Sequence, residues 1–384
     1  MRLTALLIIL ATPLAAQDCG APLPDFKAGL LAEATAMGIA AQTADAFLSG
    51  AQIDPAVLRA DQAQGVFQLD FVTFSRRLIS ASRLDAGEAM GARYTDTFDR
   101  IEAQHGIPRG VLLAFWAFET DYGAIQGDFN TRDALFTLAH DCRRPELFRP
   151  ELLAALQLYA RGDFDLATTG AWAGEIGQVQ MLPRDIIAHA VDGDGDGRIN
   201  LKGSAPDALM SGAALLSALG WRANEPALQE IIVQKNLDWS RTGLDHQLSA
   251  ADWADLGVAG RNAPLADLPG AVLLPMGRNG PAFMAYHNFT VYFEWNQSLT
   301  YVTTAAYFAT RLAGAPIYDA GNADPGLSGE QMIQLQEKLT ALGYDVGGID
   351  GILGEKTREA VQTEQARLGM PADAWPTADL LARL

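Results

Sequence analysis

Apolar side chains recur at helical spacing over most of the first 221 residues. Segments such as FKAGLLAEATAMG, VTFSRRLISASRLDAGEAMGARYTDTFDRIEAQHG and PELLAALQLYARG are of this kind, and the pattern predicts amphipathic helices. From about residue 222 to residue 287 the helical spacing of apolar residues is lost. Here the short apolar pieces LQEIIVQ, AVLLP and AFMAY lie between Pro- and Gly-rich turns. GRNGPAFMAY contains the Asn-Gly signal of a hairpin. We therefore predict a small β-rich insertion, after which SLTYVTTAAYFATRLAG returns to helix.

The chain ends in a short helical module that follows a linker. Residues 316–326, PIYDAGNADPG, have the Pro, Gly, Asn and Asp content of a linker. After it, GEQMIQLQEKLTALGYDVGGIDGILGEKTREAVQTEQARLG predicts two amphipathic helices around a Gly-rich turn, and TADLLARL supplies a third. Residues 327–384 are few for an independent core, but a three-helix unit of about this size is able to form one.

One predicted helix is apolar on all sides. In HGIPRGVLLAFWAFETDYG, Pro108 suits the first helical turn and Gly123 suits the residue just past the end. The side chains from Val111 to Phe118 cover the whole circumference, which is typical of a buried helix. Glu119 therefore falls in the last turn, where apolar neighbours and the negative end of the helix dipole both disfavour an ionised carboxylate. We expect the pKa of Glu119 to be raised.

A carboxylic acid that stays protonated near neutral pH is able to donate a proton to a leaving oxygen. The same stretch is equally compatible with a structural acid bonded to free backbone amides or to an arginine. Glycoside hydrolysis ordinarily uses two carboxylates. Asp121 would not share a helix face with Glu119, and nothing local argues for burial of Glu175. Either cleavage needs only one carboxyl group, or the second carboxyl group cannot be identified from this stretch.

Composition bounds the function further. A length of 384 residues suggests two or three domains, and 49% hydrophobic with 19% charged residues is typical of a globular protein. The net charge of -18 argues against nucleic-acid binding, which needs basic side chains to displace counterions. The five histidines show no zinc-ligand spacing. We expect no cofactor for catalysis and a monomer.

The N-terminus predicts export. MRLTALLIILATPLAAQ has one basic residue, an apolar run from Leu3 to Ala11, and then small residues. That run is too short to span a bilayer and is typical of a cleaved signal peptide over residues 1–16. No other segment approaches the length of a membrane helix. In an exported chain the two cysteines, Cys19 and Cys142, are predicted to form a disulfide; two unpaired buried thiols are the alternative.

Several blocks, in order, resemble the lytic murein transglycosylases of the membrane-bound B type in their soluble form. They are GIPRGVLLAFWAFETDYG, GDFNTRDALFTLAHDCRRPELFRPELLAALQL, AWAGEIGQVQMLP, AVDGDGDGRINLKGSAPDALMSGAALLSALGW and NFTVYFEWNQSLTYVTTAAYFATRLAG. The resemblance implies a mainly α, lysozyme-like catalytic domain over residues 17–315 that contains the β-rich insertion at about 222–287. It also implies a periplasmic enzyme that cleaves the MurNAc-GlcNAc β-1,4 bond of peptidoglycan glycan strands without water and leaves 1,6-anhydro-MurNAc ends.

The resemblance also implies roles for particular residues. In the family a single Glu, matched by Glu119, acts as acid and then as base, while the N-acetyl group of the substrate stabilises the oxocarbenium-like centre. That explains the missing second carboxylate. The glutamine of a G-x-G-Q-F-x-P type loop is matched by Gln180, whose amide suits an acetamido group, and Met181 replaces the usual Phe.

A second block, EWNQSLTY, resembles the Y-N-x-S-x-x-Y pattern of the family. It adds four substrate-binding candidates: Trp295, Asn296, Ser298 and Tyr301. Trp295 replaces a Tyr, which keeps a flat face for a sugar and loses the hydroxyl. Aromatic packing at a helix start fits Trp295 and Tyr301 about as well.

The stretch DGDGDGRIN, residues 192–200, begins like an EF-hand calcium loop. Carboxylates at the first, third and fifth positions, Gly at the sixth and a carbonyl at the seventh assign the ligands Asp192, Asp194, Asp196 and Arg198. The closing acid is missing at the twelfth position, which is Gly203. Related enzymes close a similar loop with a later Asp, matched by Asp207, although this chain has one extra residue before it. We expect a structural calcium, and a solvated Asp-Gly turn is the alternative.

Residues 327–384 resemble the three-helix peptidoglycan-binding domain of the first type in LQ, LGY, G-x-x-D-G-x-x-G and TR-x-AV. Asp350 and Thr357 are expected to shape its turn. Glu364-Gln365 and ADAWPT depart from the family pattern, so a folded module that no longer binds is an alternative. The whole chain is thus predicted to be a periplasmic lytic transglycosylase. A muramidase that uses water and a non-catalytic wall-binding scaffold are the other two hypotheses.

Overall fold

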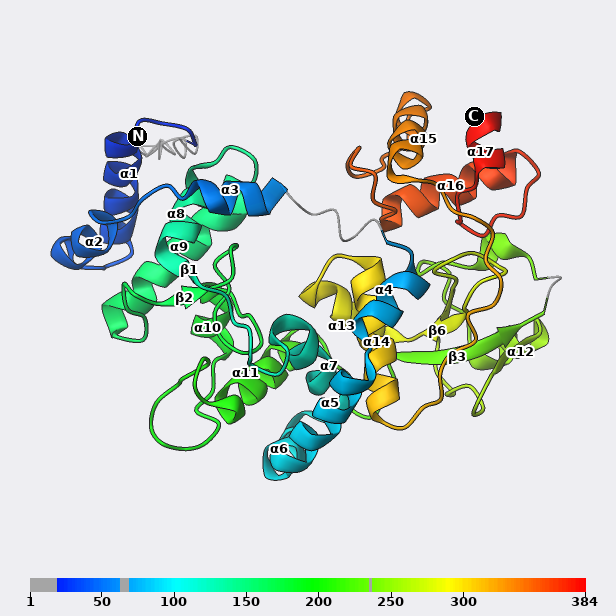
Figure 1. The fold of residues 1–384 in the computed structure, drawn as a ribbon, viewed down its shortest axis with the longest axis horizontal. Helices are drawn as coiled ribbons and strands as arrows, with labels where there is room; N and C mark the ends of the chain where they lie inside the picture. Colours follow the sequence, from blue (N-terminus) through cyan, green and yellow to red (C-terminus); the bar gives the residue numbers. More distant parts are fainter. Residues whose placement is uncertain (1–18, 63–68, 235–236) are drawn as a thin grey trace, which may run out of the picture. The chain divides into compact units, whose positions relative to one another are not determined.

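The computed structural model describes residues 19–62, 69–234 and 237–384; the predicted signal peptide over residues 1–16 lies outside them. The described chain is mainly helical, as expected, and divides into two compact units (Figure 1). The first unit contains residues 19–62, 127–175 and 182–187, and the second contains the other described residues. Among the described residues, no helix has both the length and the apolar character needed to cross a bilayer.

The first unit consists of helices that pack around α8 and α9. Its elements are α1 (Leu23–Ala36), α2 (Ala41–Leu48), α3 (Pro55–Gln62), α8 (Thr131–His140), α9 (Pro145–Arg161), most of α10 (Pro183–His189), and the short antiparallel pair β1 (Phe129–Asn130) and β2 (Thr169–Gly170). The buried rings of Phe26 and Phe136 lie 5.4 Å apart and join α1 to α8. A disulfide between Cys19 and Cys142 ties the described start of the chain to the end of α8, as predicted.

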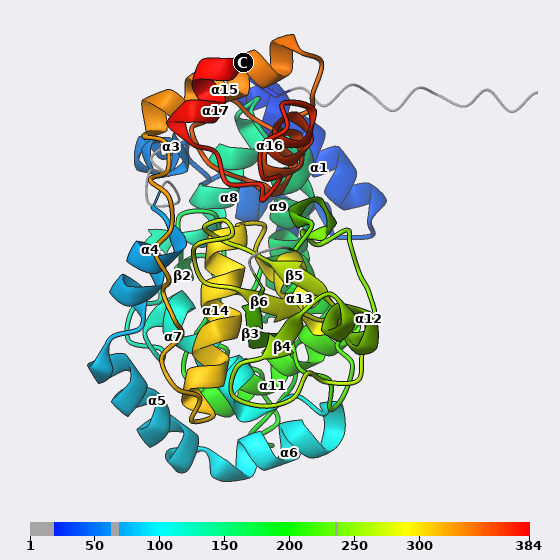
Figure 2. The ribbon, with the colours of Figure 1, turned by 90° about the vertical axis from the view of Figure 1, so that its right-hand side faces the viewer.

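The second unit surrounds the apolar helix that carries Glu119. Its first group of helices is α4 (Phe71–Leu78), α5 (Ala81–Arg93), α6 (Thr95–His105), α7 (Arg109–Thr120), α11 (Ala205–Ala218), α13 (His287–Trp295) and α14 (Leu299–Leu312). Helix α14 packs against α7 and also contacts the sheet, an arrangement that can be followed in Figure 2. A Cβ at Gly110 would lie 2.7 Å from the carbonyl oxygen of Ala309, so glycine is what lets α7 approach α14 this closely.

The region predicted to be β-rich forms a four-stranded antiparallel sheet with the order β4-β3-β6-β5. The strands are β3 (Leu228–Val233), β4 (Val258–Gly260), β5 (Ala271–Leu273) and β6 (Phe283–Ala285), with a short 3-10 helix, η2 (Trp239–Arg241), and α12 (Ala250–Asp255) alongside. The buried residues Trp253, Val272 and Met284 belong to its core. The loop over residues 274–282 that joins β5 to β6 contains the Asn-Gly pair and is longer than the tight hairpin turn that this pair favours.

The C-terminal module has the three helices that the sequence predicts. They are α15 (Gly329–Ala341), α16 (Glu355–Arg367) and α17 (Ala378–Arg383), packed around Leu335, Leu339, Val361 and Leu380. Ser328 and Gln331 form a capping box at the start of α15. The backbone amides of Asp350 and Gly351 donate to the side-chain oxygen of Gln336, and Thr357 is fully buried. The turn before α16 is therefore stabilised by buried side chains of the module itself.

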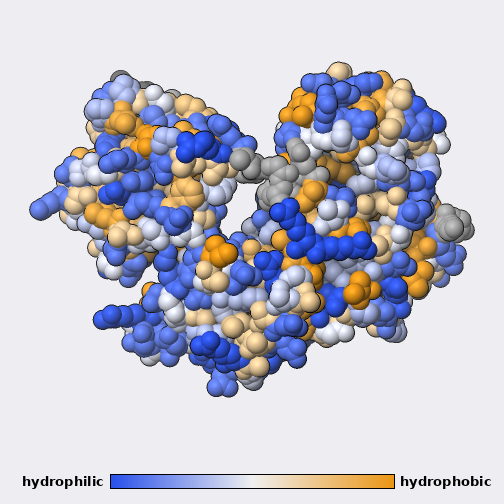
Figure 3. All heavy atoms as spheres, in the orientation of Figure 1, coloured by the Kyte–Doolittle hydropathy of each residue, from blue (hydrophilic) through white to orange (hydrophobic). Residues whose placement is uncertain are grey.

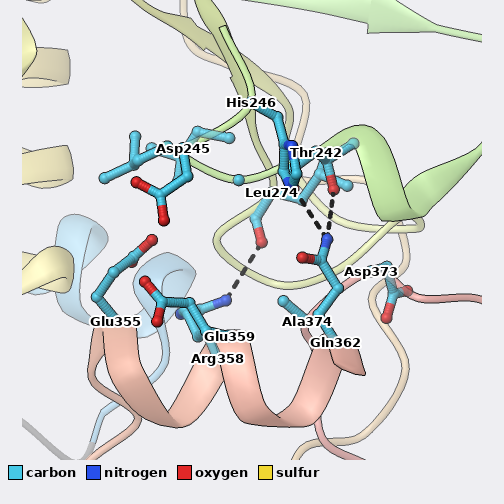
Figure 4. Close-up of a pocket in the computed structure, with 13 residues that line it drawn as sticks. Thr242, Asp245, His246, Leu274, Glu355, Arg358, Glu359, Gln362, Asp373 and Ala374 are labelled. Carbon is cyan, nitrogen blue, oxygen red and sulfur yellow. Dashed lines mark hydrogen bonds between the residues drawn. The ribbon is translucent and has the colours of Figure 1, made fainter. Parts of the chain in front are cut away.

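The C-terminal module docks on the sheet region of the same unit. The guanidinium of Arg358 on α16 is buried and donates to the carbonyl oxygen of Leu274 (Figure 4). It also donates to the carbonyl oxygen of Pro275 at 2.6 Å. The amide of Gln362 donates to the carbonyl oxygens of Trp239 and Thr242. These bonds fix α16 against the loops around β5 and η2.

Carboxyl groups gather at the same contact. Glu355 and Glu359 of α16 face Asp245 of the opposite loop (Figure 4). Burial raises the pKa of Glu355, and the neighbouring Glu359 and Asp245 raise it further while Arg358 opposes them. Burial raises the pKa of Glu359, and the charge of Asp245 and a hydrogen bond with it raise this pKa further. This contact therefore favours protonated carboxyl groups.

The segment 316–326, predicted to be a linker, makes specific contacts. Tyr318 is buried, donates or accepts a hydrogen bond with Ser75 at 2.8 Å, and packs edge-on against Tyr307 at 4.8 Å. The indole of Trp375 donates to the carbonyl oxygen of Asp324 at 2.8 Å. The segment is thus attached to the helical part of the unit at one end and to the C-terminal module at the other.

Candidate active site

Glu119 lies in the last turn of α7, and its surroundings explain why a carboxyl group is retained there. Its neighbours Phe115 and Trp116 are fully buried, whereas the Glu119 side chain is only partly buried. Two donors reach the same oxygen, Oε1. The hydroxyl of Tyr301 donates to it at 2.5 Å, and the indole Nε1–H of Trp295 donates to it at 3.0 Å. The carboxyl group is therefore held by side chains from α13 and α14.

The two donors are themselves fixed by aromatic packing. The ring of Trp295 stacks on Phe115 at 4.4 Å with an interplanar angle of 25°. The ring of Tyr301 lies edge-on to Phe118 at 5.8 Å, and Phe118 in turn stacks on Phe308 at 5.2 Å. Aromatic packing and a role at the acid, which were alternatives in the sequence, thus apply to the same two residues. Tyr301 lies at the start of α14, as expected, whereas Trp295 is the last residue of α13.

Burial raises the pKa of Glu119, as predicted from its place in the apolar helix. The hydrogen bonds from Tyr301 and Trp295 act in the opposite direction, because they stabilise the charged form. Burial also raises the pKa of Tyr301 well above its ordinary value, and the adjacent Glu119 adds to this effect. Tyr301 therefore stays a hydroxyl donor. Because both donors reach Oε1, a proton on Glu119 would occupy Oε2.

Asn296 and Ser298 build the turn between α13 and α14. The side-chain oxygen of Asn296 accepts from the backbone amide of Ser298 at 2.9 Å, and the Ser298 hydroxyl caps α14 by accepting from the amide of Tyr301 at 3.3 Å. Such caps satisfy backbone donors that a helix start leaves free. The two residues thus position Trp295 and Tyr301, which flank this turn.

The loop 176–181 brings Gln180 to the same unit. Its amide nitrogen donates to the carbonyl oxygen of Gly177 at 2.7 Å and to that of Gln126 at 3.4 Å. Gln180 has φ of 54°, in the left-handed region that side chains with a Cβ rarely adopt. Met181, which replaces the usual Phe, is almost completely buried and pairs through its backbone with Ile176. Met181 therefore packs inside the unit.

Two residues near the acid were not identified from the sequence. The hydroxyl of Thr120 donates to the carbonyl oxygen of Gln178 at 2.5 Å and accepts from the amide of Gly123 at 2.9 Å. Gln178 is buried and donates to the carbonyl oxygen of Lys202 at 3.2 Å. Their only sequence signal was their place inside the ETDYG and GEIGQVQMLP blocks.

The acidic loop brings three of its predicted ligands together. One carboxylate oxygen from each of Asp192, Asp194 and Asp196 lies within 4.8 Å of the others. Carboxylate oxygens gathered in this way fit a hard cation such as calcium. The backbone amide of Arg198 donates to Oδ1 of Asp196 at 2.8 Å.

Asp207 has a different place from the three. It is buried, and its two oxygens accept the backbone amides of Gly193, Asp194 and Asn200 at 2.7 to 3.2 Å. Asp207 closes the loop through these amides. Among the described residues, the group of acids close enough to hold a metal ion contains Asp192, Asp194 and Asp196 and does not include Asp207. The extra residue noted before Asp207 in the sequence fits this arrangement.

The helical fold of the described chain is lysozyme-like. The sequence matches the family described as transglycosylase SLT domain over residues 24–310. This chain belongs to that family, a group of lytic murein transglycosylases that are peptidoglycan-degrading lyases, as its sequence blocks suggested. Residues 328–384 match the putative peptidoglycan binding domain.

Three known proteins are similar to this chain. Membrane-bound lytic murein transglycosylase B of Escherichia coli is 32% identical over 154 residues, which span 39% of this chain and 42% of that protein. The structure of SltB3 from Pseudomonas aeruginosa in complex with NAG-anhNAM-pentapeptide is 35% identical, with a TM-score of 0.86, and covers 95% of this chain and 99% of that chain. The Escherichia coli lytic transglycosylase Slt35 in complex with calcium is 24% identical, with a TM-score of 0.65 over 75% of this chain and 92% of that one, which is a likeness of fold.

Proposed function

We propose that this protein cleaves the MurNAc-GlcNAc β-1,4 bond of peptidoglycan glycan strands and forms 1,6-anhydro-MurNAc ends. Glu119 serves as the general acid and then as the general base. The observation that carries the proposal is the pair of donors, Tyr301 and Trp295, on one oxygen of a carboxyl group whose pKa is raised by burial.

In the first step Glu119 gives its Oε2 proton to the glycosidic oxygen while the bond from that oxygen to C1 of MurNAc breaks. A raised pKa keeps the proton in place until the substrate arrives. The negative charge that develops on Glu119 is stabilised by the Tyr301 hydroxyl and the Trp295 indole, which already point at Oε1. The N-acetyl group of the substrate stabilises the positive charge at C1, so no second carboxylate is needed.

In the second step the 6-hydroxyl of the same MurNAc attacks C1, and the carboxylate of Glu119 takes up its proton. One C–O bond is broken and one is formed, and no water is consumed. The acid returns to its starting state. The role of Gln180 in this scheme is to bind an acetamido group, and Asn296 and Ser298 support the turn between α13 and α14, which both donors flank.

The other parts of the chain fit this function. The C-terminal module binds the wall, and residues 1–16 direct the protein to the periplasm, an oxidising compartment that suits the Cys19–Cys142 disulfide. Recovery of the mature protein in the cytoplasmic fraction after osmotic shock would contradict this location. Asp192, Asp194, Asp196 and the carbonyl of Arg198 hold a structural calcium, which is supported by the close carboxylates and by the calcium complex of Slt35.

The test is mass spectrometry of purified peptidoglycan digested by the wild-type protein and by Glu119→Gln. The amide keeps an oxygen for both donors but has no acidic proton. We expect wild-type products about 18 Da lighter than hydrated muropeptides, because an internal hydroxyl replaces water as the nucleophile. We expect none from the variant. Glu102→Gln, at an exposed position on α6, is the matched control and keeps activity.

Each other outcome points to a different function. Hydrated products from the wild type would identify a muramidase. Equal product yields from the wild type and Glu119→Gln would give Glu119 a structural role. Binding of peptidoglycan without any product would leave a wall-binding scaffold.

A further inference from the structure

The turn that follows Glu119 has an unusual backbone. After Thr120, the last residue of α7, three consecutive residues have positive φ: Asp121 at 50°, Tyr122 at 60° and Gly123 at 87°. Glycine adopts this region readily, but residues with a Cβ do so rarely and at a cost in energy. A helix that needed only a C-terminal cap would have glycine at the first of these positions. Asp121 and Tyr122 therefore hold the chain in a conformation that local preference opposes.

One residue of α5 holds both strained positions. The Nε of Arg83 pairs with Oδ1 of Asp121 at 3.1 Å, and the carbonyl oxygen of Arg83 accepts the hydroxyl of Tyr122 at 2.8 Å. The guanidinium is anchored in turn by a bond from Nη1 to the carbonyl oxygen of Leu78 at 2.8 Å. A Cβ at Gly87, one turn further along α5, would lie 2.5 Å from the Tyr122 hydroxyl oxygen. Helix α5 thus packs closely against the turn and bonds to both of its strained residues.

The other side of the turn contacts the loop that carries Gln180. Thr120 donates to the carbonyl oxygen of Gln178, and a Cβ at Gly123 would lie 2.6 Å from the side-chain oxygen of Gln178. Gln180, two residues later, is itself in the left-handed region. Strained residues that the surrounding structure holds in place cluster at functional sites. The turn therefore lies between the proposed acid and the proposed acetamido-binding residue.

The ion pair of Arg83 and Asp121 is poorly placed to stabilise the fold. The side chains are 22% and 49% exposed, and pairs this open to water contribute little to folding stability. The ion pair therefore matters mainly because it maintains the strained backbone of the turn after α7.

We infer that Arg83 and Asp121 are positioning residues whose ion pair holds the turn after α7 and so sets the carboxyl group of Glu119 against the loop of Gln180. The inference rests on the proposed function, because it assigns these residues to the same reaction. They act through Thr120 and Gln178 and do not touch the reacting atoms.

Asp121→Gly separates positioning from stability. Glycine tolerates φ of 50°, so the variant relieves strain while it removes the ion pair, and we expect the melting temperature to stay within a few degrees of the wild type. The kcat for release of anhydro ends falls about tenfold, because small displacements of a catalytic group have large effects on rate. KM changes by less than about twofold.

Two further variants complete the test. Asp121→Asn keeps an acceptor for Arg83 and tolerates the left-handed region, so it is the matched control and retains most of the wild-type kcat. The double variant Arg83→Met with Asp121→Gly has a kcat no lower than that of Arg83→Met alone, since one contact is lost only once.

The inference is overturned if Asp121→Gly keeps the wild-type kcat, if its kcat and melting temperature fall together, or if the two changes lower kcat independently. In each of these cases the wild type still forms anhydro ends, and the proposed function stands. A wild-type protein that forms no anhydro ends overturns the proposed function, and the inference falls with it.

Discussion

The indole N–H of Trp295 donates to Oε1 of Glu119 across 3.0 Å, although 176 residues separate the two in sequence. The flat face that the sequence offered for sugar contact stacks on Phe115. Trp295 thus acts as a hydrogen-bond donor to Glu119 through its ring nitrogen. Together with Tyr301, it leaves one carboxyl oxygen of Glu119 to carry the proton.

Tyr301→Phe is expected to raise the pKa of Glu119 above its wild-type value. The hydrogen bond from Tyr301 favours the charged form and opposes burial, so its removal makes the carboxylate less stable. The basic limb of the pH profile of kcat/KM moves to higher pH. Turnover at neutral pH falls about tenfold or more, because the developing charge loses a preorganised donor.

Trp295→Phe is the matched comparison, since phenylalanine keeps a ring against Phe115 but has no N–H. The basic limb of the pH profile of kcat/KM should also move to higher pH, but by less than in Tyr301→Phe. The reason is that the hydrogen bond from Trp295 to Glu119 is longer than the one from Tyr301. Profiles equal to the wild type in both variants would show that neither donor acts on Glu119.

Chelation of calcium is expected to lower the melting temperature by several degrees, because a ligand that binds only the folded protein stabilises it. Asp196→Asn removes one charge from the group of three carboxylates and keeps the acceptor for the Arg198 amide. The increase in melting temperature that calcium causes should then largely disappear. Without calcium, the melting temperature stays the same or increases, because repulsion among the loop carboxylates is relieved.

Asp207→Ala gives the contrasting result. Asp207 is buried and accepts three backbone amides, so its removal should lower the melting temperature with and without calcium. Thermal denaturation of both variants in calcium and in chelator makes the comparison. A wild-type curve that is the same in both conditions would exclude a structural calcium.

Docking of the C-terminal module is expected to weaken as the pH rises. Burial raises the pKa of Glu355 above its ordinary value of 4.5. A group whose pKa is raised on folding contributes stability that is fully present below the ordinary value and is lost as the pH rises through the raised one. The charges of Asp245 and Glu359 act in the same direction, and Arg358 acts against them.

Glu355→Gln is uncharged at every pH and should flatten this dependence. Melting of the wild type and of Glu355→Gln from acidic to neutral pH measures the effect, with Glu337→Gln, at an exposed position on α15, as the control. If the two curves keep the same slope with pH, Glu355 does not govern the docking.

Local pattern predicted much of the fold and part of the site. The apolar circumference of α7 and the position of Glu119 in its last turn follow from the spacing of side chains. The sequence placed Gly123 just past the end of this helix, whereas α7 ends at Thr120 and Asp121 is its cap. The difference arises because Asp121 and Tyr122 adopt a conformation that their own preferences disfavour, and contacts with Arg83 from another helix compensate.

Contacts between distant segments could not be predicted in the same way. Composition identified residues 316–326 as a linker, but it gave no sign that Tyr318 is buried against Tyr307. Asp207 shows the same limit, because the resemblance to related enzymes suggested a metal ligand, whereas in the structure its oxygens accept backbone amides. In both cases tertiary partners decide the role of a side chain.

The contacts of residues 316–326 change how a second binding site contributes to affinity. A freely moving tether raises the effective concentration of one site for a strand already held by the other, and its length sets the size of that gain. Here Tyr318 and Trp375 fasten both ends of the segment, and Arg358 fixes the module itself. If the module binds glycan as proposed, a strand that engages both sites must match a fixed span, and the module would then select strands by their geometry.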